Sequence, residues 1–142
     1  MSTVVDAIRS KRYVSFSSGG TAVFAFLGAV HALQIMLGSY QFALWRDAIR
    51  GVAGTSAGSL YGLMFALRLT NNQIERIKRN VDMRRCVSFT KIDQCHTKLG
   101  FSDMNEVRRY IHVILEEGGL SPNATMDDLH RFTRTMCVFK AS

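Results

Sequence analysis

A serine set between two glycines is the strongest chemical signal in this chain of 142 residues. The G-x-S-x-G pattern consists of Gly54, Thr55, Ser56, Ala57 and Gly58, between a β-prone run and an apolar run. A serine on a sharp strand-to-helix turn is strained, and its neighbours two residues away must lack side chains so that strand and helix can approach. The helix start favours an alkoxide or a developing oxyanion. We therefore predict that Ser56 is a nucleophile.

A second run of small residues lies nearer the N-terminus, at Ser17–Thr21. It includes Gly19 and Gly20, follows a β-prone run and precedes a long apolar stretch. The backbone N–H groups of such a turn, together with the helix dipole, can bind a phosphate or the oxyanion of a tetrahedral intermediate. The alternative interpretation is a tight turn that only joins strand to helix.

Two nucleotide-binding motifs do not fit these turns. The stretch Gly51–Ser59 has no lysine before its hydroxyl residues, and a P-loop needs that lysine to reach the phosphates. Gly19 and Gly20 do not form G-x-G-x-x-G, and no acidic residue follows about 20 positions later, as a dinucleotide-binding fold requires. The chemistry of nucleoside phosphates is therefore not indicated.

Metal chemistry and secretion are not indicated either. The cysteines and histidines show no ligand spacing, and an odd number of cysteines leaves one over in any disulfide scheme. They are Cys86, Cys95, Cys137, His31, His96, His112 and His130. The N-terminal residues contain no basic segment followed by an apolar one, so no secretory signal is predicted. We expect reduced thiols, a cytoplasmic protein and no metal or organic cofactor.

The net charge of +7 indicates anionic partners. A basic run extends from the end of one expected helix into an irregular segment, and it has no interleaved aromatic residues of the kind that bind single-stranded nucleic acid. Its members are Arg76, Lys78, Arg79, Arg84, Arg85, Lys91 and Lys98. We expect either a solvated surface or peripheral contact with anionic membrane headgroups, and no nucleic-acid partner.

Alternating strands and helices position these residues. Strands are predicted at 13–17, 49–54 and 135–139, and helices at 21–38, 59–69, 71–80, 102–117 and 126–132. Capping boxes are predicted from Thr70 with Gln73 and from Thr125 with Asp128. Such alternation predicts a parallel sheet with helices on its faces.

The apolar stretch at 21–38 has two interpretations. Its length is close to that of the shortest transmembrane helices, about 17 residues. However, it contains His31 and Gln34, and basic residues flank it only loosely. We favour a buried core helix that ends near Gly38 over a membrane span.

The two turns together resemble the patatin-like phospholipase family. That family has an S-G-G-G-x-[RK]-G-x-x-x-x-G turn, which aligns without a gap with Phe16–Gly28. It also has a later G-x-S-x-G, which corresponds to Gly54–Gly58 at the end of the matching stretch Ile49–Gly58. Asn72–Ile77 is similar to the helix after the nucleophile helix, and Thr125–Leu129 to a T-[FM]-x-x-L segment before a strand. The similarity covers about residues 12–140.

The resemblance implies a three-layer α/β/α sandwich with a mainly parallel sheet. It implies hydrolysis of a phospholipid or acylglycerol ester by a Ser–Asp dyad, with Ser56 as the nucleophile. Backbone N–H groups of Gly19, Gly20 and Thr21 would form the oxyanion hole, and no cofactor is needed. The chain departs from the pattern at Ser18, which replaces the first glycine of the triplet, and at 22–23, where Ala and Val replace the basic residue and glycine.

The base of the dyad is the main departure from the family. Family members place their aspartate in a D-G-[GA] motif, and no such motif occurs in this sequence. We interpret Asp127 and Asp128 as helix-cap residues and Asp103 as a first-turn acid. We therefore expect a partial patatin-like domain at 12–142, truncated at its C-terminus, after an N-terminal extension at 1–11. A fragment, a truncated gene product and a degenerate homologue that only binds lipid or a partner all fit this expectation.

Overall fold

The computed structural model describes residues 2–17, 23–82 and 104–140. They fall into two compact units, and each is described separately. Residues 1–68 and 125–142 form the first, which we call the sheet unit, and residues 69–124 form the second, the helical unit.

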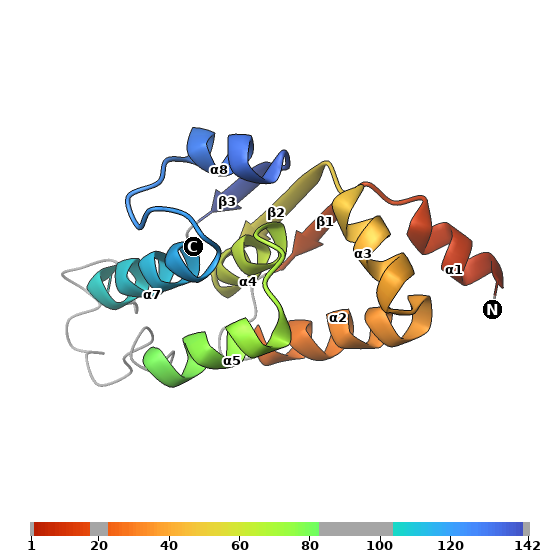
Figure 1. The fold of residues 1–142 in the computed structure, drawn as a ribbon, viewed down its shortest axis with the longest axis horizontal. Helices are drawn as coiled ribbons and strands as arrows, with labels where there is room; N and C mark the ends of the chain where they lie inside the picture. The colour runs from red at the N-terminus through yellow and green to blue at the C-terminus, as the bar shows by residue number, and fades with distance from the viewer. Residues whose placement is uncertain (1, 18–22, 83–103, 141–142) are drawn as a thin grey trace, which may run out of the picture. The chain divides into compact units, whose positions relative to one another are not determined.

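A three-stranded parallel sheet organises the sheet unit (Figure 1). Its strands are β1 (Tyr13–Phe16), β2 (Gly51–Thr55) and β3 (Met136–Lys140), and β2 lies in the middle. The register aligns Tyr13 with Gly51 and Gly51 with Met136, so all three strands start at one edge. We call it the amino edge, and the edge where the strands end the carboxyl edge.

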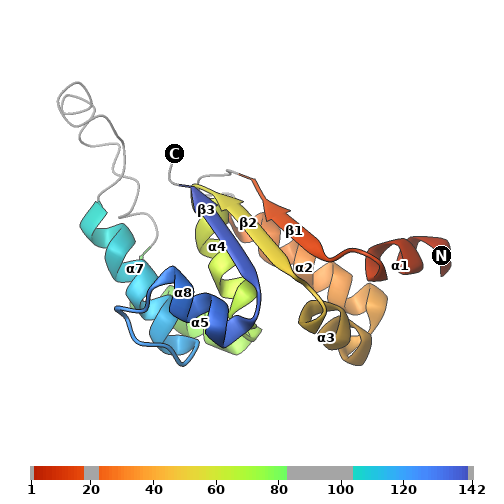
Figure 2. The same ribbon diagram turned by 90° about the horizontal axis from the view of Figure 1, so that it is seen from above.

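Five helices accompany the sheet: α1 (Ser2–Arg9), α2 (Val23–Leu37), α3 (Ser39–Asp47), α4 (Ala57–Ala66) and α8 (Met126–Thr133). Helix α4 packs on all three strands, and α2 packs on α4 and α3 (Figure 2). Among the described residues, no helix is both long and apolar enough to cross a bilayer.

An aromatic cluster fills the space between the sheet and its helices. The ring of Phe16 lies 5.4 Å from Phe26, 5.0 Å from Tyr61 and 5.5 Å from Phe65, between ring centroids. The first two pairs are edge-to-face, a favoured arrangement that adds about 0.5–1.5 kcal/mol each beyond area burial. This cluster fixes β1 against α2 and α4.

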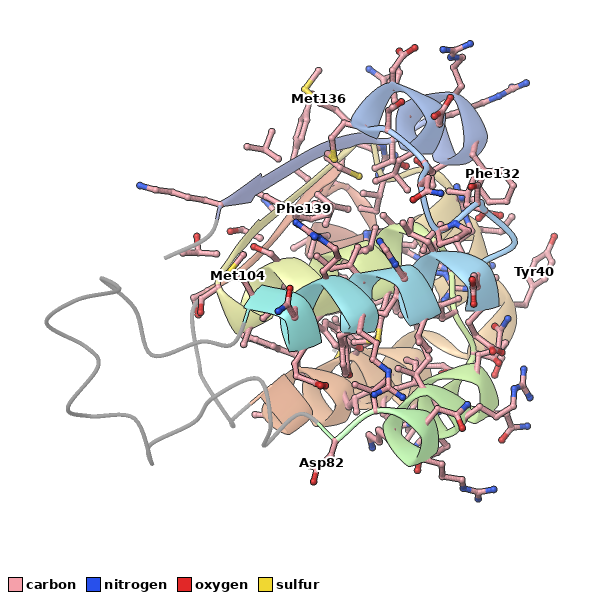
Figure 3. All side chains as sticks on the ribbon, turned by 90° about the vertical axis from the view of Figure 1, so that its left-hand side faces the viewer. Tyr40, Asp82, Met104, Phe132, Met136 and Phe139 are labelled. Carbon is pink, nitrogen blue, oxygen red and sulfur yellow. The ribbon has the colours of Figure 1, made fainter. Side chains whose placement is uncertain are left out.

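The opposite face of the sheet lies open in the described part of the chain. Tyr13, Met136 and Val138 share that face, and their exposed fractions are 73%, 62% and 61%. Figure 3 shows Met136 directed away from α4 and Phe139 directed toward it. Within the described residues, these three side chains of the sheet are therefore left uncovered.

The helical unit contains α5 (Asn71–Asn80) and α7 (Met104–Glu117). The two helices pack together and bury the apolar residues Ile74, Ile77, Tyr110 and Ile114. Arg76 of α5 forms an ion pair with Glu117, the last residue of α7, and its Nε lies 2.9 Å from the Glu117 Oε1. A capping box of Thr70 and Gln73 begins α5.

The α/β fold with a parallel sheet is confirmed, and so are the predicted capping boxes of Thr70 and Thr125. The predicted helix end at Gly38 is also confirmed, because α2 stops at Leu37 and Gly38 has a φ of 79°. The predicted burial of this helix is wrong for residues 25–37, because α2 packs on α3 and α4 along one side and only Leu37 among them is fully buried. Two of the described helices were not predicted: α3, which follows Gly38, and α1, which lies in the expected N-terminal extension.

Candidate active site

Ser56 lies between β2 and α4, at the carboxyl edge of the sheet. Its backbone has φ 54° and ψ −128°, a combination that non-glycine residues rarely adopt. Such strain costs about 1–3 kcal/mol and persists only where the surrounding structure fixes it. The serine is partly exposed and lies at the joint between β2 and α4, by which we mean residues 55–59.

Glycine is sterically required on both sides of this serine. A Cβ on Gly54 would lie 2.6 Å from the Gly58 carbonyl oxygen and from the Ser59 Cα. A Cβ on Gly58 would lie 2.3 Å from the Phe16 carbonyl oxygen. These neighbours are backbone atoms, which cannot rotate away. Strand β2, helix α4 and the end of β1 therefore approach one another only because both positions lack side chains.

Three hydrogen bonds hold the joint. The Ser56 N–H donates to the Lys140 carbonyl over 2.9 Å, and the Ser59 N–H donates to the Ser56 carbonyl over 2.8 Å. The Ser59 hydroxyl also donates to the Lys140 carbonyl, over 3.2 Å. Lys140, the last residue of β3, is thus hydrogen-bonded to both Ser56 and Ser59.

The start of α4 gives this joint a positive electrostatic potential. Ala57 and Gly58 are its first two residues, and the opening N–H groups of a helix lack intrahelical partners. No side chain caps this helix end. A negative charge that develops near Ser56 would be stabilised by these groups and by the helix dipole.

The second turn of small residues starts beside the joint. Ser17 is the last described residue before it, and a Cβ on Gly58 would lie 2.4 Å from the Ser17 carbonyl oxygen. Gly19, Gly20 and Thr21 themselves lie outside the described residues. The chain therefore enters the predicted oxyanion turn within contact distance of the segment that carries Ser56.

The described carboxylates of the sheet unit are engaged elsewhere. Asp47 pairs with Arg68 at 2.6 Å, and Asp6 lies 3.9 Å from Arg9. Asp127 pairs with Arg131. The Asp128 carboxylate accepts hydrogen bonds from the Thr125 N–H and hydroxyl, each at 2.8 Å.

Each of these acids comes before a strand along the chain, whereas Ser56 lies at the carboxyl edge, where the strands end. Asp47 precedes β2, and α8, which carries Asp127 and Asp128, precedes β3, whereas Ser56 follows β2. Thr133, at the end of α8, accepts a hydrogen bond from the Arg68 side chain through its carbonyl. The helix-cap interpretation of Asp128 is confirmed by its capping box, and Asp103 lies outside the described residues.

Two weakly acidic groups, the buried Tyr61 and the half-buried Cys137, are held in their protonated forms. Burial raises the pKa of Tyr61 to about 12, against an opposing effect of Arg46. Burial raises the pKa of the Cys137 thiol to about 11. Near neutral pH neither group is ionised, so neither is a candidate general base.

The candidate metal ligands and the basic run lie only partly within the described residues. The described residues hold no group of three or more His, Cys, Asp or Glu that could bind a metal ion. Cys86, Cys95 and His96 lie outside them, and so does most of the basic run. Within α5, Arg76 pairs with Glu117 and Lys78 lies 2.7 Å from Glu75, so these two cations are partly neutralised.

Sequence reasoning missed Ser59 and the carbonyl of Lys140. A backbone carbonyl leaves no signal in a sequence, because every residue has one. Ser59 directly follows the G-x-S-x-G pattern, and a small hydroxyl residue in the first turn of a helix was a detectable signal.

The family model for patatin-like phospholipases matches residues 14–137 of the chain. The matched range contains the whole of β2, Ser56 and α4, together with the turn that follows β1. No curated protein and no solved structure matches the chain.

Proposed function

Because the chain belongs to the patatin-like phospholipase family, whose members act on lipids, we propose that it carries the nucleophile of a lipid acyl hydrolase. The observation that supports this proposal best is the strained backbone of Ser56 between two glycines that tolerate no side chain. Backbone strain of this kind lowers the stability of the fold, and strained residues cluster at active sites and ligand-binding sites.

In the proposed reaction, the Ser56 hydroxyl attacks the ester carbonyl of a phospholipid or acylglycerol. An aspartate accepts the serine proton and transfers it to the departing alcohol, and water then releases the fatty acid from the acyl-serine. Backbone N–H groups of Gly19, Gly20 and Thr21 would bind the oxyanion. The D-G-[GA] motif that supplies the family's aspartate does not occur in these 142 residues.

The test compares the chain alone with the chain joined to a segment that carries a D-G-[GA] motif. Removing one member of a catalytic unit costs about 10⁴–10⁶ in rate, so the chain alone should hydrolyse a short-chain chromogenic ester barely above background. The joined segment should raise kcat by several orders of magnitude, and Ser56→Ala should abolish that gain. Hydrolysis that survives Ser56→Ala would contradict the proposal.

The alternative is a lipid-binding or interaction module without turnover. It is favoured by the engagement of all four described aspartates of the sheet unit with Arg or Thr partners. We propose for either function a cytoplasmic protein in peripheral contact with anionic membranes. Binding to acidic vesicles should then weaken with salt, because the Debye length shortens to about 8 Å at physiological ionic strength. Equal binding to neutral vesicles would contradict the electrostatic contribution.

A further inference from the structure

We propose that Ser59 is a positioning residue that fixes Ser56 to the end of β3. The inference rests on the proposed function for its catalytic consequence, whereas its structural part stands on the hydrogen bonds alone. Ser59 lies in the first turn of α4 and is partly exposed.

Ser59 bonds to both of the residues that define the joint. Its N–H donates to the Ser56 carbonyl over 2.8 Å. Its hydroxyl donates over 3.2 Å to the Lys140 carbonyl, which also accepts the Ser56 N–H over 2.9 Å. The three residues thus form a closed ring of hydrogen bonds in which Ser59 is the only side-chain donor.

The position of Lys140 explains why this ring matters. The β2–β3 ladder ends where Thr55 pairs with Lys140, so the Ser56 N–H is held by the last residue of an edge strand. Strand ends fray because few neighbours constrain them. A second donor on the same carbonyl, supplied by a rigid helix, reduces that fraying.

The strain at Ser56 requires such support. A φ of 54° is maintained only while the surrounding bonds oppose relaxation. Gly54 and Gly58 permit the close approach but form no side-chain bonds that hold it. The Ser59 hydroxyl adds a bond across the joint, and its loss would let Ser56 sample relaxed conformations in which its hydroxyl is misplaced.

The first measurement is the hydrogen exchange rate of the Ser56 amide in the 142-residue chain. A hydrogen bond contributes about 1 kcal/mol, so Ser59→Ala should accelerate this exchange about five- to tenfold. Ser59→Thr, which keeps the hydroxyl, should restore the slow rate. Ser10→Ala is the matched control, because the Ser10 hydroxyl also donates to a backbone carbonyl, that of Ala7 at 2.8 Å.

The second measurement is covalent labelling of Ser56 by a fluorophosphonate in the chain joined to a segment that carries a D-G-[GA] motif, because that segment supplies the proton acceptor. Ser59→Ala should lower the maximal labelling rate about five- to tenfold and leave the half-saturating reagent concentration unchanged, as expected of misplacement rather than lost binding. Ser59→Cys keeps the size of the side chain with a weak donor and replaces Ser59→Ala if that variant melts early. If the exchange rate of the Ser56 amide is the same in Ser59→Ala and Ser59→Cys as in the wild type, the inference is overturned. If the joined chain with wild-type Ser59 is not labelled although its Ser56 amide responds to Ser59→Ala, the proposed function is contradicted and the ring of hydrogen bonds stands.

Discussion

At the scale of single residues, Gly58 tolerates no substitution. The Cβ of Gly58→Ala would overlap the carbonyl oxygens of Phe16 and Ser17 at 2.3 and 2.4 Å, and only a shift of β1 or α4 could relieve this. We expect a loss of about 3 kcal/mol or more in the free energy of unfolding. Urea denaturation measures it, and Gly28→Ala, where no atom lies within 4 Å, is the control. Equal stability of the two variants would contradict the close approach.

Cys137 should be a slow thiol despite its partial exposure. Its pKa of about 11 leaves about one molecule in a thousand as thiolate at pH 8, and only the thiolate reacts with iodoacetamide. We expect alkylation about a hundredfold slower than in the chain unfolded by guanidinium, with the rate rising up to about pH 11. Mass spectrometry of the Cys137 peptide measures this. Equal rates in the folded and unfolded chain would show that burial does not protect the thiol.

At the scale of elements, the capping box of α8 carries a prediction. Thr125→Ala removes the hydroxyl that accepts the Asp128 N–H over 3.1 Å, and should cost about 1 kcal/mol. The Thr125 N–H and hydroxyl lower the pKa of Asp128 by bonding to its charged form. This contribution is present above the ordinary pKa of aspartate and is lost as the pH falls through the lowered value.

The measurement is a series of thermal melts at several pH values. The difference between wild type and Thr125→Ala should be full at neutral pH and should narrow in acid. Thr125→Ser keeps the hydroxyl and should melt close to wild type. A difference that does not change with pH would show that the Asp128 carboxylate takes no part in the capping box.

Elements with side-chain signals could be predicted from the sequence. The boxes at Thr70 and Thr125 mark helix starts by residue type, and apolar runs beside glycines mark the joint at Ser56. Helix α3 was not predicted from the sequence. Its N-cap is Gly38, which has no side chain to indicate a helix start, and only Phe42 and Trp45 of this helix are buried, so its apolar pattern is weak. The ring of Ser56, Ser59 and Lys140 could not be predicted, because two of its three bonds join backbone groups.

The candidate site was predictable to the same limited extent. A serine between glycines indicates a candidate nucleophile by residue type and spacing. A carboxylate that would accept its proton from another strand or helix can be identified only when the fold is known. Asp128 and Asp47 illustrate this difference, because the capping box of Asp128 with Thr125 was predictable from the sequence, whereas the ion pair of Asp47 with Arg68, 21 residues further along the chain, was not. Functional residues within one turn can therefore be predicted from the sequence, whereas those that the fold brings together from distant segments cannot.

At the scale of the molecule, the described part of the sheet unit exposes apolar side chains in at least two places. One is the open sheet face with Tyr13, Met136 and Val138. Another is the outer side of α2 and α3, where Ile35 and Tyr40 are 71% and 73% exposed. Parallel sheets are normally covered on both faces, and contiguous exposed apolar patches mark surfaces that associate.

We therefore expect the 142-residue chain to self-associate as its concentration rises, and Ile35→Glu to reduce this. The substitution places a charge on the α2 surface without disturbing the core, because Ile35 is mostly exposed. Light scattering over a concentration series measures the apparent mass, and circular dichroism checks that the helix content is retained. Asn72→Glu adds the same charge at an exposed polar position of α5 and controls for net charge. If the two variants associate equally, charge alone governs the behaviour. If Ile35→Glu associates as wild type does, the α2 surface plays no part, and the open face of the sheet is the next to test through Val138→Glu.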